Sequence, residues 1–157
     1  MTTPKIESQT RQHEVEGERE PTNGEHSTNK LAGEVDEGEL LVSEIEKRIA
    51  LLKNEAMEAG DPFNAPSERD FVHFVTSHRQ LRRPNIYLVD NGNLRAVWKN
   101  AAGLHLGLQF LGGAQVQFVI FAKRSDAADV VRSAGRDTLK GIERQITSFD
   151  LAELVYA

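Results

Sequence analysis

The sequence predicts an α+β fold: a four-stranded antiparallel β-meander, with two helices before it, one helix after it, and the helices mainly on one face of the sheet. Two kinds of observation lead to this prediction, the period of the apolar residues and the length of the connections. Apolar residues recur with a helical period before residue 80, with a period of two between residues 85 and 123, and again with a helical period after residue 137. The connections within the middle part are too short for parallel neighbours, so consecutive strands must be antiparallel.

The first 38 residues differ in composition from the rest of the chain. They contain nine acidic and four basic residues, which accounts for the whole net charge of −5, and almost no residue that could be buried. Such a segment cannot offset the entropy that ordering would cost. We therefore expect residues 1–38 to be a disordered acidic tail. Residues 39–157, with 15 acidic and 15 basic residues, are expected to form a single α+β domain.

Two amphipathic helices are expected before the sheet. Asp36 is a candidate N-cap of the first helix, with Glu39 three residues later, and Gly60 is its expected end. Ser67 is expected to cap the second helix, with Asp70 three residues on, and Pro84 prevents its continuation. The apolar stripes of the two helices are Leu41, Ile45, Ile49, Leu52 and Ala56, and Phe71, Phe74, Val75 and His78.

Four strands are expected at 86–90, 94–99, 104–111 and 116–123, with turn residues between them. In the second hairpin, a three-residue loop at 112–114 pairs Phe110 with Val116 and gathers the apolar residues on one face. In the first hairpin two registers remain open. A three-residue loop at 91–93 groups Ile86 and Leu88 with Leu94, whereas a two-residue Asn-Gly turn groups residues 87 and 89 with Leu94.

The segment after the fourth strand is harder to assign. Residues 125–136 fit either a short edge strand or a helical turn, and both alternatives stay open. Asp137 or Thr138 is expected to cap a final helix, and residues 149–157 form a short helical or extended end. The apolar stripe of the final helix is Leu139, Ile142, Ile146 and Phe149.

Several classes of chemistry are disfavoured. The chain has no cysteine, which excludes disulfides and thiolate catalysis. His73 and His78 are five residues apart and point to different sides of a helix, so no metal or other cofactor is expected. No nucleophile–base set is visible, and we predict that the chain is not an enzyme. Without a secretory signal or a long apolar run, a cytoplasmic protein that does not contact membranes is expected.

The outer face of the sheet carries the candidate partner-binding residues. In either register this face is expected to be unusually apolar, through residues such as Tyr87, Val89, Val97, Val119 and Phe121. An uncovered apolar patch marks a surface for a protein partner or a homodimer, unless the last helix or the C-terminal segment covers it. The predicted contact residues are Tyr87, Arg95, Val97, Gln109, Gln117 and Phe121, with Arg79, Arg82 and Arg83 at the edge of the face.

Residues 82–124, with 134–151, resemble a family of small uncharacterised bacterial proteins. That family pairs a Pro-led "DNGNLRAVW" hairpin with a "GLQFLG" hairpin, both of which stand in this sequence. The resemblance brings no catalytic residue. Since such proteins are in some cases encoded beside toxin-like genes, it implies an antitoxin- or immunity-like protein that binds a toxin-like partner.

We therefore expect a non-enzymatic protein-interaction module, and two alternatives remain. The first is a nucleic-acid-binding regulator that uses the basic cluster at 78–83, although cations after a helix also complement its dipole and residues 39–157 carry no net charge. The second is a small enzyme or ligand carrier with a pocket between sheet and helices, around His73, His78 and Trp98.

Overall fold

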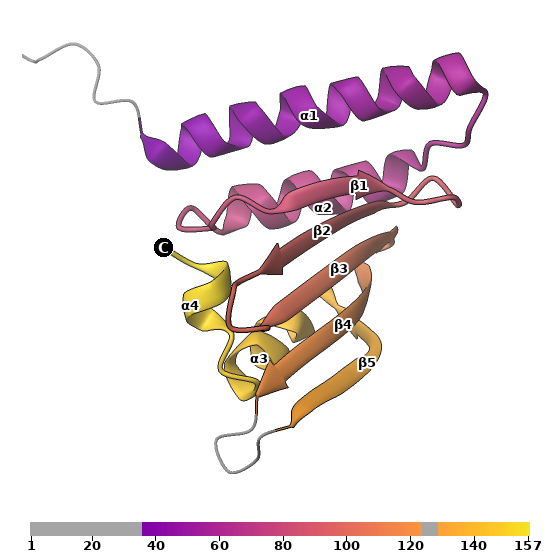
Figure 1. Cartoon of the computed structure of the whole chain (residues 1–157). Coiled ribbons are helices and arrows are strands. Elements are labelled where there is room, and N and C mark those ends of the chain that lie inside the picture. Colours follow the sequence, from indigo (N-terminus) through magenta and orange to yellow (C-terminus); the bar gives the residue numbers. More distant parts are fainter. Residues whose placement is uncertain (1–35, 124–128) are drawn as a thin grey trace, which may run out of the picture. The chain divides into compact units, whose positions relative to one another are not determined.

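A computed structural model describes residues 36–123 and 129–157 (Figure 1). The helices α1 (Glu37–Ala59) and α2 (Ala65–Ser77) come first. They are followed by β1 (Asn85–Leu88), β2 (Leu94–Lys99), β3 (His105–Gly112), β4 (Gln115–Lys123), β5 (Val130–Thr138), α3 (Leu139–Ser148) and α4 (Ala152–Val155). The α+β class and the antiparallel sheet are confirmed, but the sheet has five strands and two helices follow it. The expected tail lies outside the described residues except for 36–38, which belong to the start of α1.

The strands form an antiparallel meander in the order β1-β2-β3-β4-β5. Since alternate residues of a strand point to the same side, pairs such as Ala96 with Leu108 and Leu108 with Phe118 gather apolar side chains on one face. The helix α2 packs against β2 and β3, α3 against β4 and β5, and α4 against β2. Figure 1 shows α2 and α3 behind the sheet and α4 beside the end of β2. No described helix covers the opposite face, which we call the open face.

One hydrophobic core lies between the sheet and the helices. It is densest under α2, where Phe71, Phe74 and Phe110 are at most 1% exposed. The ring centroid of Phe110 lies 4.8 Å from that of Phe71 and 5.7 Å from that of Phe74. Trp98 is also buried, and its indole N–H donates a hydrogen bond to the Arg82 carbonyl at 2.7 Å. Burying each such side chain contributes about 1.5–3 kcal/mol. The helices are therefore fixed on one side of the sheet, which leaves the other side free.

The start of α2 differs from the prediction. The helix begins at Ala65, and Asn64 is its N-cap residue, so Ser67 is not a cap. Ser67 is fully buried instead: its hydroxyl donates to the Phe110 carbonyl at 2.6 Å and accepts from the Leu94 N–H at 2.9 Å. Asp70 accepts from the Ala114 N–H at 2.8 Å in the β3–β4 turn. Through these hydrogen bonds, both side chains connect α2 to the sheet.

Other predicted helix ends are confirmed. Asp36 caps α1 by accepting from the Gly38 N–H at 3.1 Å. Gly60 ends that helix with φ of 73°, a left-handed conformation that glycine adopts without strain. Of the two caps proposed for α3, Thr138 is the one observed, accepting from the Gly141 N–H at 2.9 Å.

The hairpin predictions are confirmed in their faces and partly in their registers. Phe110 pairs with Val116 as predicted, with an irregularity between Phe110 and Gly112 that brings Gly112 opposite Gln115. In the first hairpin, where the sequence leaves two groupings open, Ile86 and Leu88 share a face with Leu94, as the three-residue loop predicts. Leu88 itself stands opposite Leu94, whereas a three-residue loop would place Asp90 there. Of the open segment 125–136, residues 130–136 are strand, and 125–128 lie outside the described residues.

Candidate functional site

The open face is built from three parallel rows of side chains that cross β2, β3, β4 and β5. The strand register places residues directly opposite one another, so each row follows from the pairing. We call them the amide row (Arg95, Gln109, Gln117, Arg136), the small row (Val97, Gly107, Val119, Ala134) and the ring row (Lys99, His105, Phe121, Arg132). Tyr87 of β1 extends the amide row beside Arg95.

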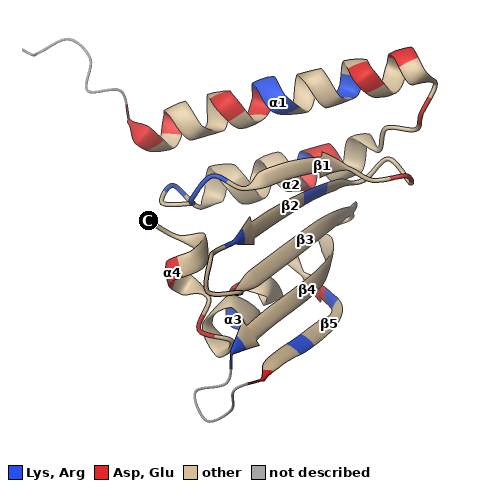
Figure 2. Cartoon of the chain, viewed as in Figure 1, with Lys and Arg blue, Asp and Glu red and all other residues tan. Residues whose placement is uncertain are grey.

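At the described strand positions of this face, all the charged residues are positive. The strand positions that point to it hold five cations and no carboxylate, and the cations are Arg95, Lys99, Lys123, Arg132 and Arg136. Figure 2 shows these blue bands on β2, β4 and β5, while red bands accumulate on α1. In the amide and ring rows the two end positions are cations, on β2 and β5. These two strands are three strand spacings apart, or about 14 Å.

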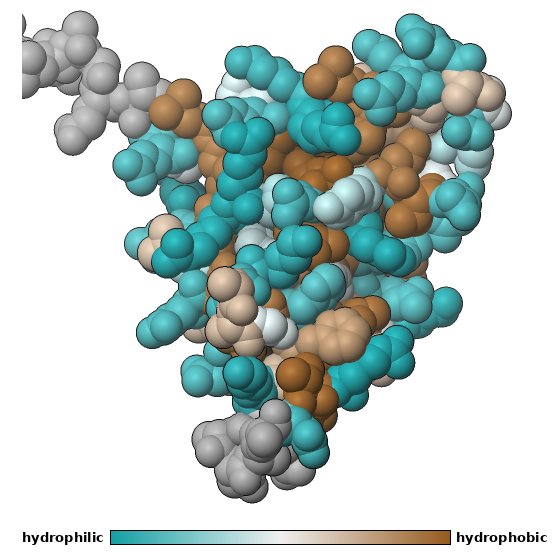
Figure 3. Space-filling view, in the orientation of Figure 1, coloured by the Kyte–Doolittle hydropathy of each residue, from teal (hydrophilic) through white to brown (hydrophobic). Residues whose placement is uncertain are grey.

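The open face is less apolar than the sequence predicted. Val97 is only 8% exposed, Val119 and Phe121 are partly buried, and Tyr87 and Val130 alone among the large apolar residues of these strands are well exposed there, at 48% each. Figure 3 shows hydrophilic side chains spread across this face with separate apolar patches between them. Because no described helix lies here, neighbouring side chains supply the cover. The prediction of a large apolar patch is therefore wrong in extent.

A depression of about 170 Å³ lies at the centre of the open face. Gly107 forms part of its lining and leaves it open, since a Cβ there would lie 3.4 Å from the His105 Nε2 atom. The Arg95 guanidinium donates to the Gln109 side-chain oxygen at 2.8 Å, and Gln109 is 8% exposed. Gln109 thus positions Arg95 at the rim, whereas Gln117 is exposed and free to contact a ligand.

The ring row contains the one histidine of the face. His105 and Phe121 meet edge to face, with centroids 5.3 Å apart and planes at 84°. Partial burial, followed by the positive charges of Lys99 and Arg95, holds the pKa of His105 below its usual value of 6.5. At neutral pH the ring is therefore predominantly uncharged, and it presents an aromatic surface between cations.

The structure brings six predicted contact residues together on the open face and separates them from part of the basic cluster. Arg79 forms an ion pair with Asp36 at 3.2 Å, and Arg83 forms one with Glu44 of α1 at 2.9 Å. Arg82 donates to the Tyr156 carbonyl at 2.8 Å. Arg82 and Arg83 lie near the β1–β2 rim with Lys99, around a cavity of about 490 Å³, whereas Arg79 lies between α1 and α2. These cations follow α2 rather than occupying its last turn.

The expected pocket around two histidines and Trp98 is divided in two. His73 and His78 line a cavity of about 350 Å³, and Trp98 lines the separate 490 Å³ cavity. Both ring nitrogens of His78 face acceptors, the Phe74 carbonyl at 2.7 Å and the Glu143 carboxylate at 3.0 Å. His78 therefore joins α2 to α3.

Sequence reasoning missed the cations of β5. Arg132 and Arg136 are four residues apart, which is consistent with one face of a strand, but the segment that holds them had no assigned structure. Across residues 36–123 and 129–157, no three His, Asp or Glu side chains come together as a metal site, and no helix is long and apolar enough to cross a membrane. Comparison with family models, curated proteins and solved structures finds no match to this chain.

Proposed function

We propose that this chain is a non-catalytic binding protein whose open face holds single-stranded nucleic acid. One observation carries the proposal: five cations and no carboxylate surround aromatic rings and a free amide on an uncovered sheet face. Single-stranded nucleic acids are bound by such a combination, in which cations contact phosphates and bases stack on aromatic rings.

The rows supply these contacts in separate places. The end cations of the amide and ring rows stand on β2 and β5 and would contact phosphates on both sides of the depression. Between them, Phe121 offers a ring on which a base stacks, and Gln117 offers a donor and an acceptor for a base edge. The domain's lack of net charge does not oppose this function, because its acidic residues are concentrated elsewhere, notably on α1.

Fluorescence anisotropy with a labelled single-stranded RNA tests the proposal. Four phosphate contacts should make the logarithm of the association constant fall with the logarithm of salt concentration at a slope of about −2 to −3. Phe121→Leu keeps an apolar side chain but removes the ring, and should weaken binding by about 1–3 kcal/mol without changing that slope.

Two results would overturn the proposal. The first is the absence of binding at low salt. The second is a pair of equalities: Phe121→Leu binds the RNA as tightly as the unaltered protein does, and both proteins bind heparin, a polyanion without bases, as tightly as they bind the RNA. That result would show simple charge attraction. If acidic proteins bind the open face and no nucleic acid does, the partner is an acidic protein instead.

A protein partner, the class that the family resemblance implies, is the second candidate function. It is favoured by α1, which exposes Leu40 at 50% and Leu51 at 55% of their surfaces. They are eleven positions apart, so they lie on the same side of the helix, about three turns apart. If α1 pairs with a second copy, Leu40→Glu with Leu51→Glu should convert a dimer to a monomer in sedimentation experiments. If the unaltered protein already sediments as a monomer, α1 does not pair with a second copy.

A further inference from the structure

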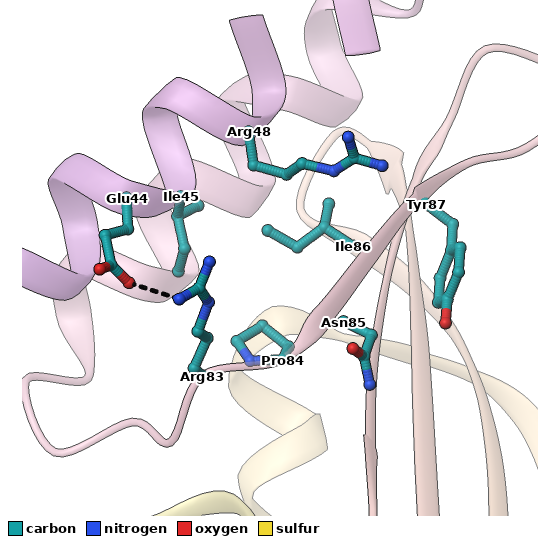
Figure 4. A pocket seen from close by; sticks show the side chains of 8 residues that line it. All are labelled: Glu44, Ile45, Arg48, Arg83, Pro84, Asn85, Ile86 and Tyr87. Atoms are coloured by element: carbon teal, nitrogen blue, oxygen red, sulfur yellow. Dashed lines mark ion pairs between the residues drawn. The ribbon is translucent and has the colours of Figure 1, made fainter. Parts of the chain in front are cut away.

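The strand β5 has an open edge. It is the last strand in the sheet order, and β4 is its only strand partner within the described part of the chain. All nine of its residues are at least partly exposed. The other edge strand, β1, has only four residues, and Figure 4 shows Glu44, Ile45 and Arg48 of α1 over it. The two edges of the sheet are therefore not equivalent.

The edge of β5 is regular enough to accept another strand. Its pairing with β4 runs without interruption from Val130 to Thr138, and it contains neither proline nor a bulge. Edge strands present unpaired N–H and C=O groups, and an extended peptide can add to them as a further strand. Proteins protect long, regular edges with prolines, bulges, covering segments or charged side chains. Of these, the described residues of β5 offer only charged side chains, which leave the edge open to a strand of complementary charge.

Charge decides which kind of strand fits this edge. Arg132 and Arg136 both point to the open face, separated by Ala134. A second copy of β5 would bring four arginines to one seam, and their repulsion opposes that pairing. A strand with carboxylates opposite Arg132 and Arg136 gains two cross-strand ion pairs instead.

We propose that the free edge of β5 binds an extended acidic segment of a partner protein as a sixth strand of the sheet. Because Arg132 and Arg136 are four residues apart, the carboxylates of the incoming strand stand at positions i and i+4. Main-chain hydrogen bonds to β5 supply much of the affinity, and the two arginines select the sequence. This site shares Arg132 and Arg136 with the proposed nucleic-acid face, but its argument does not rest on nucleic-acid binding.

An NMR titration of the full chain with synthetic peptides tests the proposal. The probe is the capped peptide Thr-Glu-Val-Thr-Val-Glu-Thr, in which both glutamates lie on one side of an extended strand. Amide signals of β5 should shift and exchange more slowly with solvent as the peptide binds. Replacing Arg132 and Arg136 with Gln should weaken the peptide about tenfold. Arg69→Gln, an exposed site on α2, should leave the affinity unchanged.

Two altered peptides separate strand addition from charge attraction. Moving the second glutamate one position earlier places the carboxylates on opposite sides of the strand and should weaken binding. Alternate N–H groups of an extended peptide point to opposite edges, and only one edge faces β5. N-methylation of the odd-numbered residues and N-methylation of the even-numbered residues should therefore differ: one of the two peptides loses binding and the other retains it. Arg95→Gln with Lys99→Gln should reduce RNA binding and leave peptide affinity intact.

Three results would overturn the proposal. The first is that the NMR signals of β5 do not shift at millimolar peptide. The second is that the arginine double variant and Arg69→Gln lose peptide affinity equally. The third is that both N-methylated peptides bind with equal affinity. Failure of the peptide with retention of RNA binding rejects the edge site alone. The reverse pattern rejects the proposed nucleic-acid function alone.

Discussion

At the scale of single residues, Ser67 shows how one buried hydroxyl can join three elements. It lies in α2, donates to the Phe110 carbonyl of β3 and accepts from the Leu94 N–H of β2. Ser67→Ala leaves both backbone groups without their partner in a fully buried position. We expect the free energy of unfolding to fall by about 1–3 kcal/mol, measured by urea denaturation.

Ser77→Ala is the matched control for this substitution. Ser77 lies at the end of the same helix, is exposed, and bonds only to the His73 carbonyl one turn earlier. Its loss should change stability by less than about 0.5 kcal/mol. Equal losses in the two variants would show that the buried hydrogen bonds of Ser67 add nothing beyond the helix itself.

His105 gives the open face a dependence on pH. Its pKa is lowered by burial and by Lys99 and Arg95, so the unbound ring is neutral at pH 7. Phosphates that contact these cations offset their charge, which raises the pKa of His105 and favours uptake of a proton on binding. By linkage, RNA affinity should rise as the pH falls from about 7.5 to about 5.5.

The test is RNA affinity measured by anisotropy across this pH range in the unaltered protein and in His105→Gln. The substitution removes the titrating group and keeps a polar side chain, so the pH dependence should become flatter. An identical pH profile in the two proteins would place the titrating group elsewhere.

At the scale of elements, the β3–β4 turn depends on its contact with α2. Gly112 has φ of 88°, and a Cβ there would lie 2.7 Å from the Pro66 Cβ atom. Gly113 also has a positive φ, of 63°, but a Cβ there would meet nothing within 4 Å. Gly113→Ala should therefore cost only backbone strain, about 1 kcal/mol, whereas Gly112→Ala should cost more through the clash with α2.

Thermal unfolding of the two variants measures this difference. Both changes add one methyl group at a left-handed position of the same turn, so the extra loss of melting temperature in Gly112→Ala reports the helix contact. Equal melting temperatures would show that α2 moves away from the turn without cost.

The elements differ in how well the sequence predicts them. Period-two patterning places Leu106, Leu108 and Phe110 on the core face correctly, because a one-residue slip would expose all of them. It does not fix the β1–β2 register, since a shift of two residues leaves every side chain on its face. It also leaves β5 undecided between an edge strand and a helical turn, because its core-facing positions include Ser133 and Gly135 and no apolar alternation is visible.

At the scale of the whole described domain, net charge conceals how the charges are arranged. The helix α1 carries six glutamates and three cations, while the open face carries cations alone. Pairing between α1 and the α2–β1 connection engages Arg79 and Arg83. Sequence reasoning could predict the open-face residues of β2, β3 and β4 from their alternation. Only the topology places Arg132 and Arg136 beside them.

This arrangement can be tested with two variants that each lose three positive charges. One replaces Arg79, Arg82 and Arg83 with Gln, and the other replaces Arg95, Arg132 and Arg136 with Gln. Their net charges are identical, so any nonspecific attraction of RNA falls equally in both. If the open face contacts phosphates, only the second variant should make the salt dependence shallower, by about 2 in slope.

The first variant should instead lose stability. Its exposed ion pairs with Asp36 and Glu44 contribute at most about 1 kcal/mol each, and RNA binding should remain close to that of the unaltered protein. A loss of binding confined to this variant would place the nucleic-acid site in the basic cluster after α2. Equal losses in both would show that RNA responds only to total charge, because each variant loses the same number of positive charges from a different set of residues.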